Sequence, residues 1–283
     1  MLTTRLRNYL IDLRSRQRIA IALSRGAAMM HARRVDLARP ATWEFSGFSQ
    51  NGEDGVLDVL RGQMRASNRY FLEIGAADGI ENNTAWLLVA EKYAGLMVDG
   101  NEAALELARR TVFEQSVGSE GELMFVTRDN VASLRGKLPV ADPDVFSLDI
   151  DGNDYHVAEA ALACGFRPRI FVVEFNSVYG PERSLTIEYD EGFVFTRAHP
   201  TWLYYGVSIA AWRRLFERHG YRFVTVERNG VNAFFVDPAW FDAEFLDRVD
   251  GLPFAENRYQ GRKFKVSSEE QFRWIEGERF VTV

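Results

Sequence analysis

The sequence has little cysteine and histidine, and its N-terminal segment lacks a long run of uncharged apolar residues. Cys164 is the single cysteine, so an intrachain disulfide is excluded and a reducing, cytoplasmic setting is expected. The apolar run Ile19–Leu23 is five residues long and lies between Arg18 and Arg25. That length is far too short for a transmembrane helix and does not fit a conventional secretory signal.

A net positive charge is found only in the N-terminal segment. Nine arginines against Asp12 and Asp36 give residues 1–40 a net charge of +7, which leaves −13 for the rest of a chain whose total is −6. An acidic body of this kind argues against a nucleic-acid enzyme with a broad basic face. The apolar fraction of 47% is ordinary for a globular protein and excludes overall disorder.

The basic N-terminal extension, residues 1–42, is expected to be an amphipathic helix. Its apolar residues at helical spacing are Leu2, Leu6, Tyr9, Leu10 and Leu13. We expect this helix to pack on the acidic body or on a second subunit of a homo-oligomer. Peripheral contact with an anionic membrane surface and an organellar transit peptide are the alternatives that the sequence leaves open.

Residues 43–240 alternate between strand-like and helix-like patterns. The first predicted strands are Tyr70–Ile74, Gly95–Val98, Leu123–Val126, Val145–Ile150 and Arg169–Glu174. Helical patterns lie between them, for example at Thr84–Lys92 and Glu102–Arg110. Such alternation predicts an α/β fold with a mostly parallel sheet and helices on both faces.

The last part of this region predicts a change of strand direction. A helix is expected to begin at Ser208, an N-cap residue, and to end before Gly220. Two strands follow, Tyr221–Val226 and Asn232–Val236, and the Asn229–Gly230 pair between them is typical of a hairpin. A seven-stranded sheet with an antiparallel last strand is the Rossmann-like class I methyltransferase fold, whereas nicotinamide-binding domains usually lack that strand.

The motif Phe71–Gly79 is the strongest functional signal in the chain. An apolar strand there ends in a turn with Gly75 and Gly79, and the next strand ends at Asp99. Glycines let backbone approach a ligand, and an acid about 20 residues later can accept hydrogen bonds from ribose hydroxyls. The pattern therefore predicts a nucleoside site, although an ordinary strand–turn–helix junction would use similar residues.

The turn sequence favours S-adenosylmethionine over a nicotinamide dinucleotide. A dinucleotide turn normally reads GxGxxG, because the second glycine admits the pyrophosphate. Here Ala77 lies between the glycines, and Glu73 and Asp78 add acids beside the turn. Acids are poor neighbours for pyrophosphate and good ones for a ligand that carries a sulfonium and an amino group.

Four short motifs in this order and spacing resemble the FkbM-type methyltransferases. They are Ser49–Gly55, Phe71–Thr84, Asp149–Tyr155 and Gly230–Val236. The resemblance spans roughly residues 48–237 and implies a class I fold, S-adenosylmethionine as the donor, and O-methylation of a sugar, glycan or natural-product hydroxyl. Two motifs depart from the family, Val98–Asn101 and the unusually acidic Asp149–Asp154 turn. The choice of acceptor is therefore not carried over.

Donor-binding residues are expected at the ends of the first four strands and before the first one. The candidates are Gln50, Glu53, Glu73, Gly75, Ala76, Asp78, Gly79, Asn83, Asp99, Gly100, Asn101, Asp129, Asn130 and Asp149. Asp99 and Asn101 would meet the ribose, and Asp129 the adenine amino group. A turn or an N-cap explains Asp129 equally well. A capped helix start is compatible with the donor role of Glu53, and Asn83 is also expected to cap the helix that follows it.

Acids also follow the fourth and fifth strands, where an acceptor hydroxyl would have to lie. Asp149 and Asp151 share one side of the fourth strand end, as Glu174 and Asn176 do on the fifth. Oxygen ligands converging there suit Mg²⁺, for which Asp151, Glu174 and Asn176 are the candidate ligands. In the alternative without metal, Asp149 or Asp151 accepts a hydrogen bond from the donor's amino group.

A route without metal needs a general base, and the candidates are His199 and His156 together with Asp149 and Asp151. His199 lies in an insert at residues 177–206 whose aromatic residues suit stacking on a sugar or another ring. The C-terminal extension, residues 241–283, is expected to pack on the core or on a partner subunit.

The sequence as a whole predicts an O-methyltransferase with a small-molecule or carbohydrate acceptor and no nucleic-acid partner. A nicotinamide-dependent oxidoreductase and a non-catalytic S-adenosylmethionine-binding scaffold are the alternatives.

Overall fold

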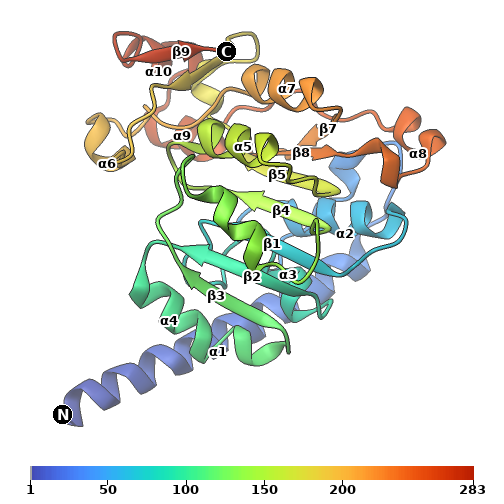
Figure 1. The fold of residues 1–283 in the computed structure, drawn as a ribbon, viewed down its shortest axis with the longest axis vertical. Helices are drawn as coiled ribbons and strands as arrows, with labels where there is room; N and C mark the ends of the chain where they lie inside the picture. Colours follow the sequence, from blue (N-terminus) through green and yellow to red (C-terminus); the bar gives the residue numbers. More distant parts are fainter. Residues whose placement is uncertain (1) are drawn as a thin grey trace.

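A computed structural model describes residues 2–283 and shows a central seven-stranded sheet (Figure 1). The strand order is β3-β2-β1-β4-β5-β8-β7. The strands are β1 (Tyr70–Ile74), β2 (Ala94–Asp99), β3 (Ser119–Leu123), β4 (Val145–Leu148), β5 (Ile170–Glu174), β7 (Arg222–Val226) and β8 (Asn232–Val236). Within this sheet, β8 pairs antiparallel with both β5 and β7, while the other pairs are parallel. The predicted fold class is confirmed.

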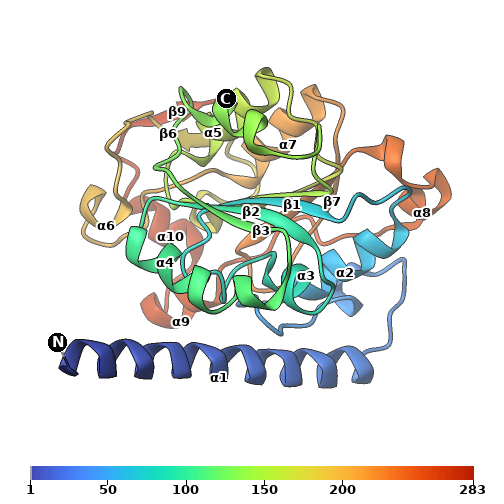
Figure 2. The same ribbon diagram turned by 60° about the horizontal axis from the view of Figure 1, so that its bottom comes forward.

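The two faces of the sheet are covered by different helices (Figure 2). Alternate residues of each strand point to opposite faces, so Phe71 joins one core cluster while Leu72 and Ile74 join the other. The first cluster takes side chains from α1 (Leu2–Ala32), α2 (Glu53–Gln63), α3 (Ala85–Val89), α4 (Glu102–Arg110) and α8 (Ala243–Arg248). The second takes them from α5 (Asp154–Ala163) and α7 (Ile209–Arg218).

The register of the parallel strands places four chain turns at one edge of the sheet. Ile74 pairs with Val98 of β2 and with Leu148 of β4, and Leu148 pairs with Val173 of β5. The residues that come next in the chain are therefore neighbours in space. In a doubly wound sheet this carboxyl edge is where ligands bind.

Most predicted helices and strands are confirmed. The helix α7 is an example in which the residues that predicted its two ends have the expected roles. Ser208 accepts a hydrogen bond from the backbone N–H of Ala211, as an N-cap should, and Gly220 ends the helix region with a φ of +80°. The predicted helix over Glu102–Arg110 has the observed bounds of α4, whereas Thr84–Lys92 is helical only over Ala85–Val89.

The prediction of a strand at Leu123–Val126 was wrong, because β3 ends where that segment begins. The observed strand has a polar sequence, Ser-Glu-Gly-Glu-Leu, and lies at the sheet edge with its side chains half exposed. An edge strand needs no continuous apolar run. The strand was therefore predicted too late in the chain, on the apolar Met124–Val126 segment that follows the observed strand.

The helix α1 lies along the outside of the body and extends beyond it at its N-terminal end (Figure 2). Its buried residues Ile19, Ala22 and Gly26 face the body, and Gly26 lies directly against the indole ring of Trp86. Among residues 2–283, no helix combines the length and the apolar character that a membrane crossing needs.

The insert and the last part of the C-terminal extension, residues 258–283, form a separate layer. The insert's β6 (Leu185–Ile187) pairs antiparallel with β9 (Phe280–Thr282) near the C-terminus. Beside them, a third core cluster includes Tyr179, Phe272 and Ile275. The remaining helices of this layer are α6 (Phe195–Ala198), α9 (Arg258–Phe264) and α10 (Ser268–Arg273). The described residues also form short 3-10 helices at Pro40–Thr42, Phe113–Gln115, Val131–Lys137, Ser177–Tyr179 and Pro238–Trp240.

The contact between α1 and Trp86 makes Gly26→Ala destabilising. A Cβ at Gly26 would lie 2.3 Å from the buried indole ring. We expect the free energy of unfolding, measured by urea denaturation, to fall by about 1–3 kcal/mol, as for other overpacked sites. Gly62 in α2 is the matched control, because nothing lies near its added Cβ. Gly62→Ala should raise stability by up to about 1 kcal/mol, and equal effects at both sites would contradict this packing.

Candidate active site at the carboxyl edge of the sheet

A large hollow lies at the carboxyl ends of β1, β2 and β4. It opens to solvent and holds about 1040 Å³ of empty space. Its lining residues are Ile74, Gly75, Ala77, Val98, Asp99, Gly100, Asn101, Met124, Phe125, Val126, Asp149, Ile150, Asp151, Gly152, Asn153 and Phe193. We call this space the donor hollow. It brings together Gly75, Asp99 and Asp149, which the sequence placed in one site.

Gly75 allows β1 and β4 to come together at the floor of the donor hollow. Its φ is +90°, and a Cβ built on it would lie 1.7 Å from the carbonyl oxygen of Asp149. No other residue fits there without moving the backbone. Gly79 also has a positive φ, +71°, and its added Cβ would press on Val112, so it shapes the turn.

The carboxylate of Asp99 is fixed by backbone donors on both sides. Its Oδ2 accepts from the N–H of Ala77 at 2.7 Å, and its Oδ1 accepts from the N–H of Asn101 at 2.7 Å. Asn101 itself caps α4 by accepting from the N–H of Ala104. Each carboxylate oxygen keeps a second lone pair, so Asp99 can still accept hydrogen bonds from a ligand in the hollow.

Three carboxylates meet beside the donor hollow and form what we call the acid cluster: Asp149, Asp151 and Glu174. One oxygen of each lies within 4.8 Å of the others. Burial, together with the neighbouring acids, raises the pKa of Asp149 and of Glu174 well above the ordinary values. Burial and the charge of Asp154 raise the pKa of Asp151 to about 6. The cluster therefore favours a bound proton or cation.

The turn after β4 holds the acid cluster in place. Asp154, which sequence reasoning did not select, accepts from the N–H groups of Ile150 at 2.9 Å and Gly152 at 2.8 Å. This arrangement puts Asp151 in the left-handed region with a φ of +53°. A non-glycine residue is uncommon there, although aspartate and asparagine adopt it more readily than most. The sequence feature that could have identified Asp154 is the high number of acidic residues in this turn.

A smaller second hollow lies behind Gly75 and Asp149. It holds about 380 Å³ of empty space and is lined by Gln50, Asn51, Glu53, Glu73, Gly75, Glu81, Asn82, Asn83, Asp149, Val231 and Asn232. The predicted donor residues Gln50, Glu53, Glu73 and Asn83 are thus gathered here, next to the donor hollow but not within its lining.

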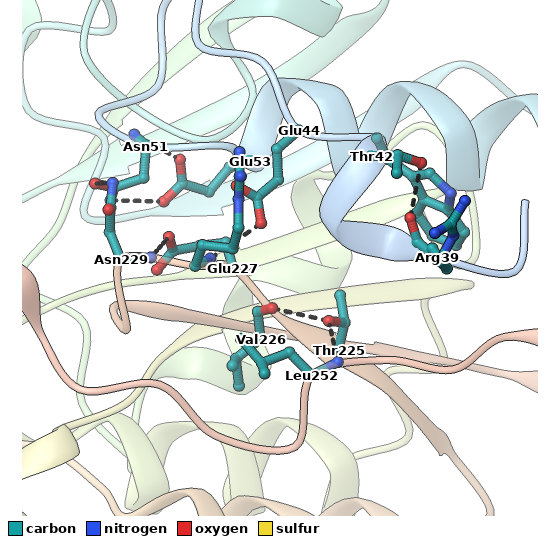
Figure 3. Close-up of polar contacts among 12 residues, drawn as sticks. Arg39, Thr42, Glu44, Asn51, Glu53, Thr225, Val226, Glu227, Asn229 and Leu252 are labelled. Atoms are coloured by element: carbon teal, nitrogen blue, oxygen red, sulfur yellow. Dashed lines mark hydrogen bonds and ion pairs between the residues drawn. The ribbon is translucent and has the colours of Figure 1, made fainter. Parts of the chain in front are cut away.

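The carboxylates of this second hollow are already engaged by the protein. Glu53 accepts hydrogen bonds from the side chains of Asn51 and Asn232, and it faces Glu227 (Figure 3). Burial and the charge of Glu53 raise the pKa of Glu227 to about 7. Glu73 holds the start of α3 by accepting from the N–H of Thr84 at 3.1 Å.

Burial also raises the pKa of Glu73 to about 7. Its other partners are the backbone N–H of Asn83 and the hydroxyls of Thr84 and Ser147. With both of its oxygens bonded to protein groups, Glu73 serves as an anchor between β1, β4 and α3.

Several predicted donor residues lie away from the donor hollow. Asp78 pairs with Arg18 of α1, and Asp129 is largely exposed, with Arg128 at 3.8 Å. Asn130 closes its own turn, accepting from the N–H of Thr127 and donating to the carbonyl of Phe125. In place of Asp129, the apolar Met124–Val126 segment lines the hollow. Phe125 is 57% exposed there. The sequence analysis did not identify it as a site residue, because it predicted a strand over this segment.

The structure does not bring the two candidate histidines to the acid cluster. The Nε2 atom of His156 is 2.9 Å from the carbonyl oxygen of Ile187, on the insert side of α5. The Nδ1 atom of His199 is 2.7 Å from the hydroxyl of Thr201 in its own loop. Neither is a lining residue of the donor hollow, the second hollow or the hollow described next. A general base is therefore expected among the carboxylates.

The expectation that Asn176 is a metal ligand is not supported by its contacts. It is 1% exposed, and its Oδ1 accepts from the N–H of Val178. Its Nδ2 donates to the carbonyls of Leu203 and Tyr205, at 2.8 and 3.0 Å. The carboxamide is thus used to hold the insert against the end of β5.

A third hollow of about 510 Å³ lies where the insert meets the C-terminal extension. Its lining residues are Asp151, Phe195, Thr201, Trp202, Leu203, Tyr205, Asn257, Tyr259, Gln260, Lys263 and Phe264. We call it the aromatic hollow. Asp151 lines both the donor hollow and the aromatic hollow, so the acid cluster lies at their junction.

The strand order, the antiparallel β8 and a hollow at the carboxyl edge define the class I methyltransferase fold. No family model matches the chain, and no curated protein matches it. Two solved structures illustrate the similarities found.

An O-methyltransferase from Bacillus cereus in complex with SAH is 16% identical, over 77% of this chain and 89% of that one, with a TM-score of 0.39. The O-methyltransferase TomG from Streptomyces achromogenes in complex with SAM is 18% identical, over 64% of this chain and 74% of that one, with a TM-score of 0.37. At these values the fold assignment rests on the strand order alone.

The acid cluster makes stability depend on pH through Asp151. Its raised pKa means that the folded state holds this proton more tightly than the unfolded chain between about pH 4 and pH 6. Stability is lost as the pH rises through that window, because folding then places a charged, partly desolvated carboxylate beside Asp154. Asp151→Asn removes this cost, and asparagine accepts the positive φ.

We therefore expect the melting temperature of the Asp151→Asn variant, relative to the unaltered protein, to rise between pH 4 and pH 7 in the presence of EDTA. The exposed Asp129→Asn is the control and should show a constant difference. A constant difference for Asp151→Asn as well would contradict the raised pKa of Asp151 in the acid cluster.

Proposed function

We propose that this protein is an S-adenosylmethionine-dependent O-methyltransferase. The observation that carries the proposal is the Asp99 carboxylate, held by two backbone N–H groups, in the same hollow as the side-chain-free backbone of Gly75. The Asp99 carboxylate suits the ribose hydroxyls of a nucleoside. The backbone of Gly75 allows the group attached to that ribose to approach closely. Four short sequence motifs that resemble those of FkbM-type methyltransferases favour the same donor.

The donor hollow accommodates the parts of S-adenosylmethionine in a simple order. Asp99 would accept hydrogen bonds from the ribose hydroxyls, and Gly100 and Asn101 complete that end of the lining. The exposed ring of Phe125 offers a face on which adenine can stack. The backbone from Gly75 to Ala77 would lie along the methionine portion. Gly79 would act on this binding by shaping the turn.

The methyl acceptor is proposed to lie in the aromatic hollow, with its hydroxyl at the acid cluster. Asp151 borders both hollows, so it is the side chain best placed between donor and acceptor. In a route without metal, the pKa of Asp151, raised to about 6, suits a base that takes a proton near neutral pH. Trp202 and Tyr259 are exposed at this hollow and suit the face of a sugar or another ring. A sugar, glycan or natural-product hydroxyl is therefore the proposed acceptor class.

The acid cluster also fits a divalent cation. It offers three carboxylate oxygens within 4.8 Å of one another, and oxygen is the ligand atom that Mg²⁺ prefers. Asp149, Asp151 and Glu174 would hold the ion, a set that differs from the sequence-based one by the replacement of Asn176 with Asp149. Bound there, Mg²⁺ would lower the pKa of the acceptor hydroxyl. The like charges that raise the carboxylate pKa values would be offset by such an ion.

Calorimetric titration with S-adenosylhomocysteine tests the donor site. The unaltered protein should bind it and should not respond to NAD. Asp99→Ala should weaken binding about 100-fold, since it removes two charge-assisted hydrogen bonds to the ribose. Asp129→Ala, an acid outside the hollow, is the control and should bind within about twofold of the unaltered protein. Binding of NAD alone, or full affinity in Asp99→Ala, would refute the proposed donor site.

Metal binding can be measured with Mn²⁺, whose electron paramagnetic signal reports the free ion. We expect the Asp151→Asn, Glu174→Gln double variant to bind Mn²⁺ at least about tenfold more weakly, because two of three carboxylate ligands are lost. The double variant should still bind S-adenosylhomocysteine, which shows that it is folded. Unchanged Mn²⁺ affinity, or methyl transfer that is indifferent to EDTA, would exclude a metal at the acid cluster and leave the donor site standing.

A further inference from the structure

The rotation of α1 about its own axis is fixed by contacts with the body. Ser15, Ile19 and Ala22 are buried on one side of the helix. On that side Asp12 pairs with Arg110 of α4 at 3.2 Å. The helix therefore presents a defined opposite face to the surroundings.

That opposite face carries a line of large apolar side chains, which we call the outer stripe: Leu6, Tyr9, Leu10, Leu13 and Ile21. With 3.6 residues per turn, Leu6, Leu10 and Leu13 lie across the helix from Ile19 and Ala22, and Tyr9 and Ile21 flank that line. Leu6, Tyr9 and Ile21 are 59%, 63% and 64% exposed. Single exposed apolar residues are ordinary, but a stripe along one helix face marks a contact surface.

Arginines border the outer stripe on both sides. Helical geometry places Arg7 and Arg14 along one edge, and Arg5 and Arg16 along the other. Arg16 pairs with Glu114 at 2.6 Å, whereas no ion pair joins the other three to an acid among residues 2–283. The one acid of the helix, Asp12, lies on the inner side. An apolar strip between two basic edges is the pattern of a helix lying in the surface of an anionic membrane.

We propose that the outer stripe of α1 docks the protein on an anionic lipid surface. The apolar side chains would enter the boundary between headgroups and acyl chains, while the arginine stems extend outward to the lipid phosphates. The acidic body lies on the other side of the helix and would face away from the membrane (Figure 2).

A second copy of the chain fits the outer stripe less well. Two stripes packed together would bring four arginine edges close to one another, with no acid of α1 on that side to separate them. Like charges at such a seam oppose association.

The N-terminal turns of α1 add a further argument, because residues 5–11 are exposed on all sides of the helix. A helical segment without tertiary contacts is marginal in water and is stabilised by adsorption at an interface.

Flotation with lipid vesicles tests this proposal. The full chain should float with vesicles of phosphatidylcholine and phosphatidylglycerol in equal parts and should not float with phosphatidylcholine alone. Raising NaCl from about 0.1 M to about 0.5 M should release much of it. Leu10→Glu with Leu13→Glu should weaken binding about 100-fold or more, and Arg7→Gln with Arg14→Gln roughly 10- to 30-fold.

The matched controls keep the character of each position. Leu10→Met with Leu13→Met retains apolar side chains, and Arg7→Lys with Arg14→Lys retains charge, so both should bind nearly as the unaltered protein does. All four positions are exposed, and circular dichroism should show unchanged helix content. Absence of vesicle binding would overturn the proposal. So would a lipid-free dimer, seen by analytical ultracentrifugation, that Leu10→Glu with Leu13→Glu dissolves.

Discussion

The candidate site depends on one close approach, between Gly75 at the end of β1 and the Asp149 carbonyl at the end of β4. A side chain at Gly75 would begin 1.7 Å from that oxygen. Because Gly75 has no side chain, the neighbouring parallel strands β1 and β4 can end side by side. The turns that follow them diverge from this point. The Asp99 carboxylate lies on one side of this point and the acid cluster on the other. Backbone packing thus sets the proposed positions of the donor and the acceptor.

The arrangement separates two kinds of carboxylate. Asp99 keeps its place because two backbone N–H groups hold it in an open hollow. Asp149 and Glu174 lie closer to the core and close to other acids, so burial and mutual repulsion raise their pKa values. One environment suits hydrogen bonding to neutral hydroxyls, and the other suits binding a proton or a cation. Under the proposed function, the same sheet edge would serve ligand binding and proton transfer a short distance apart.

The sequence predicted the parts of this site that follow directly from strand ends. Gly75, Asp99, Asp149 and Glu174 each follow or end an apolar strand, so their meeting at one edge could be expected from the parallel sheet alone. Residues carried by loops could not be placed in this way. His199 forms a hydrogen bond within its own loop, and Asp129 is exposed to solvent. Neither position could be predicted, because the local sequence does not determine the path of either segment. Phe125 was missed because a polar edge strand precedes it.

A crystal structure of the protein with S-adenosylhomocysteine tests the central claim most directly. The account predicts the ribose within hydrogen-bonding distance of the Asp99 carboxylate, adenine against Phe125, and the sulfur atom directed toward Asp151. Occupancy of the second hollow or the aromatic hollow in place of the donor hollow would contradict the account. A ribose remote from Asp99 would contradict it equally.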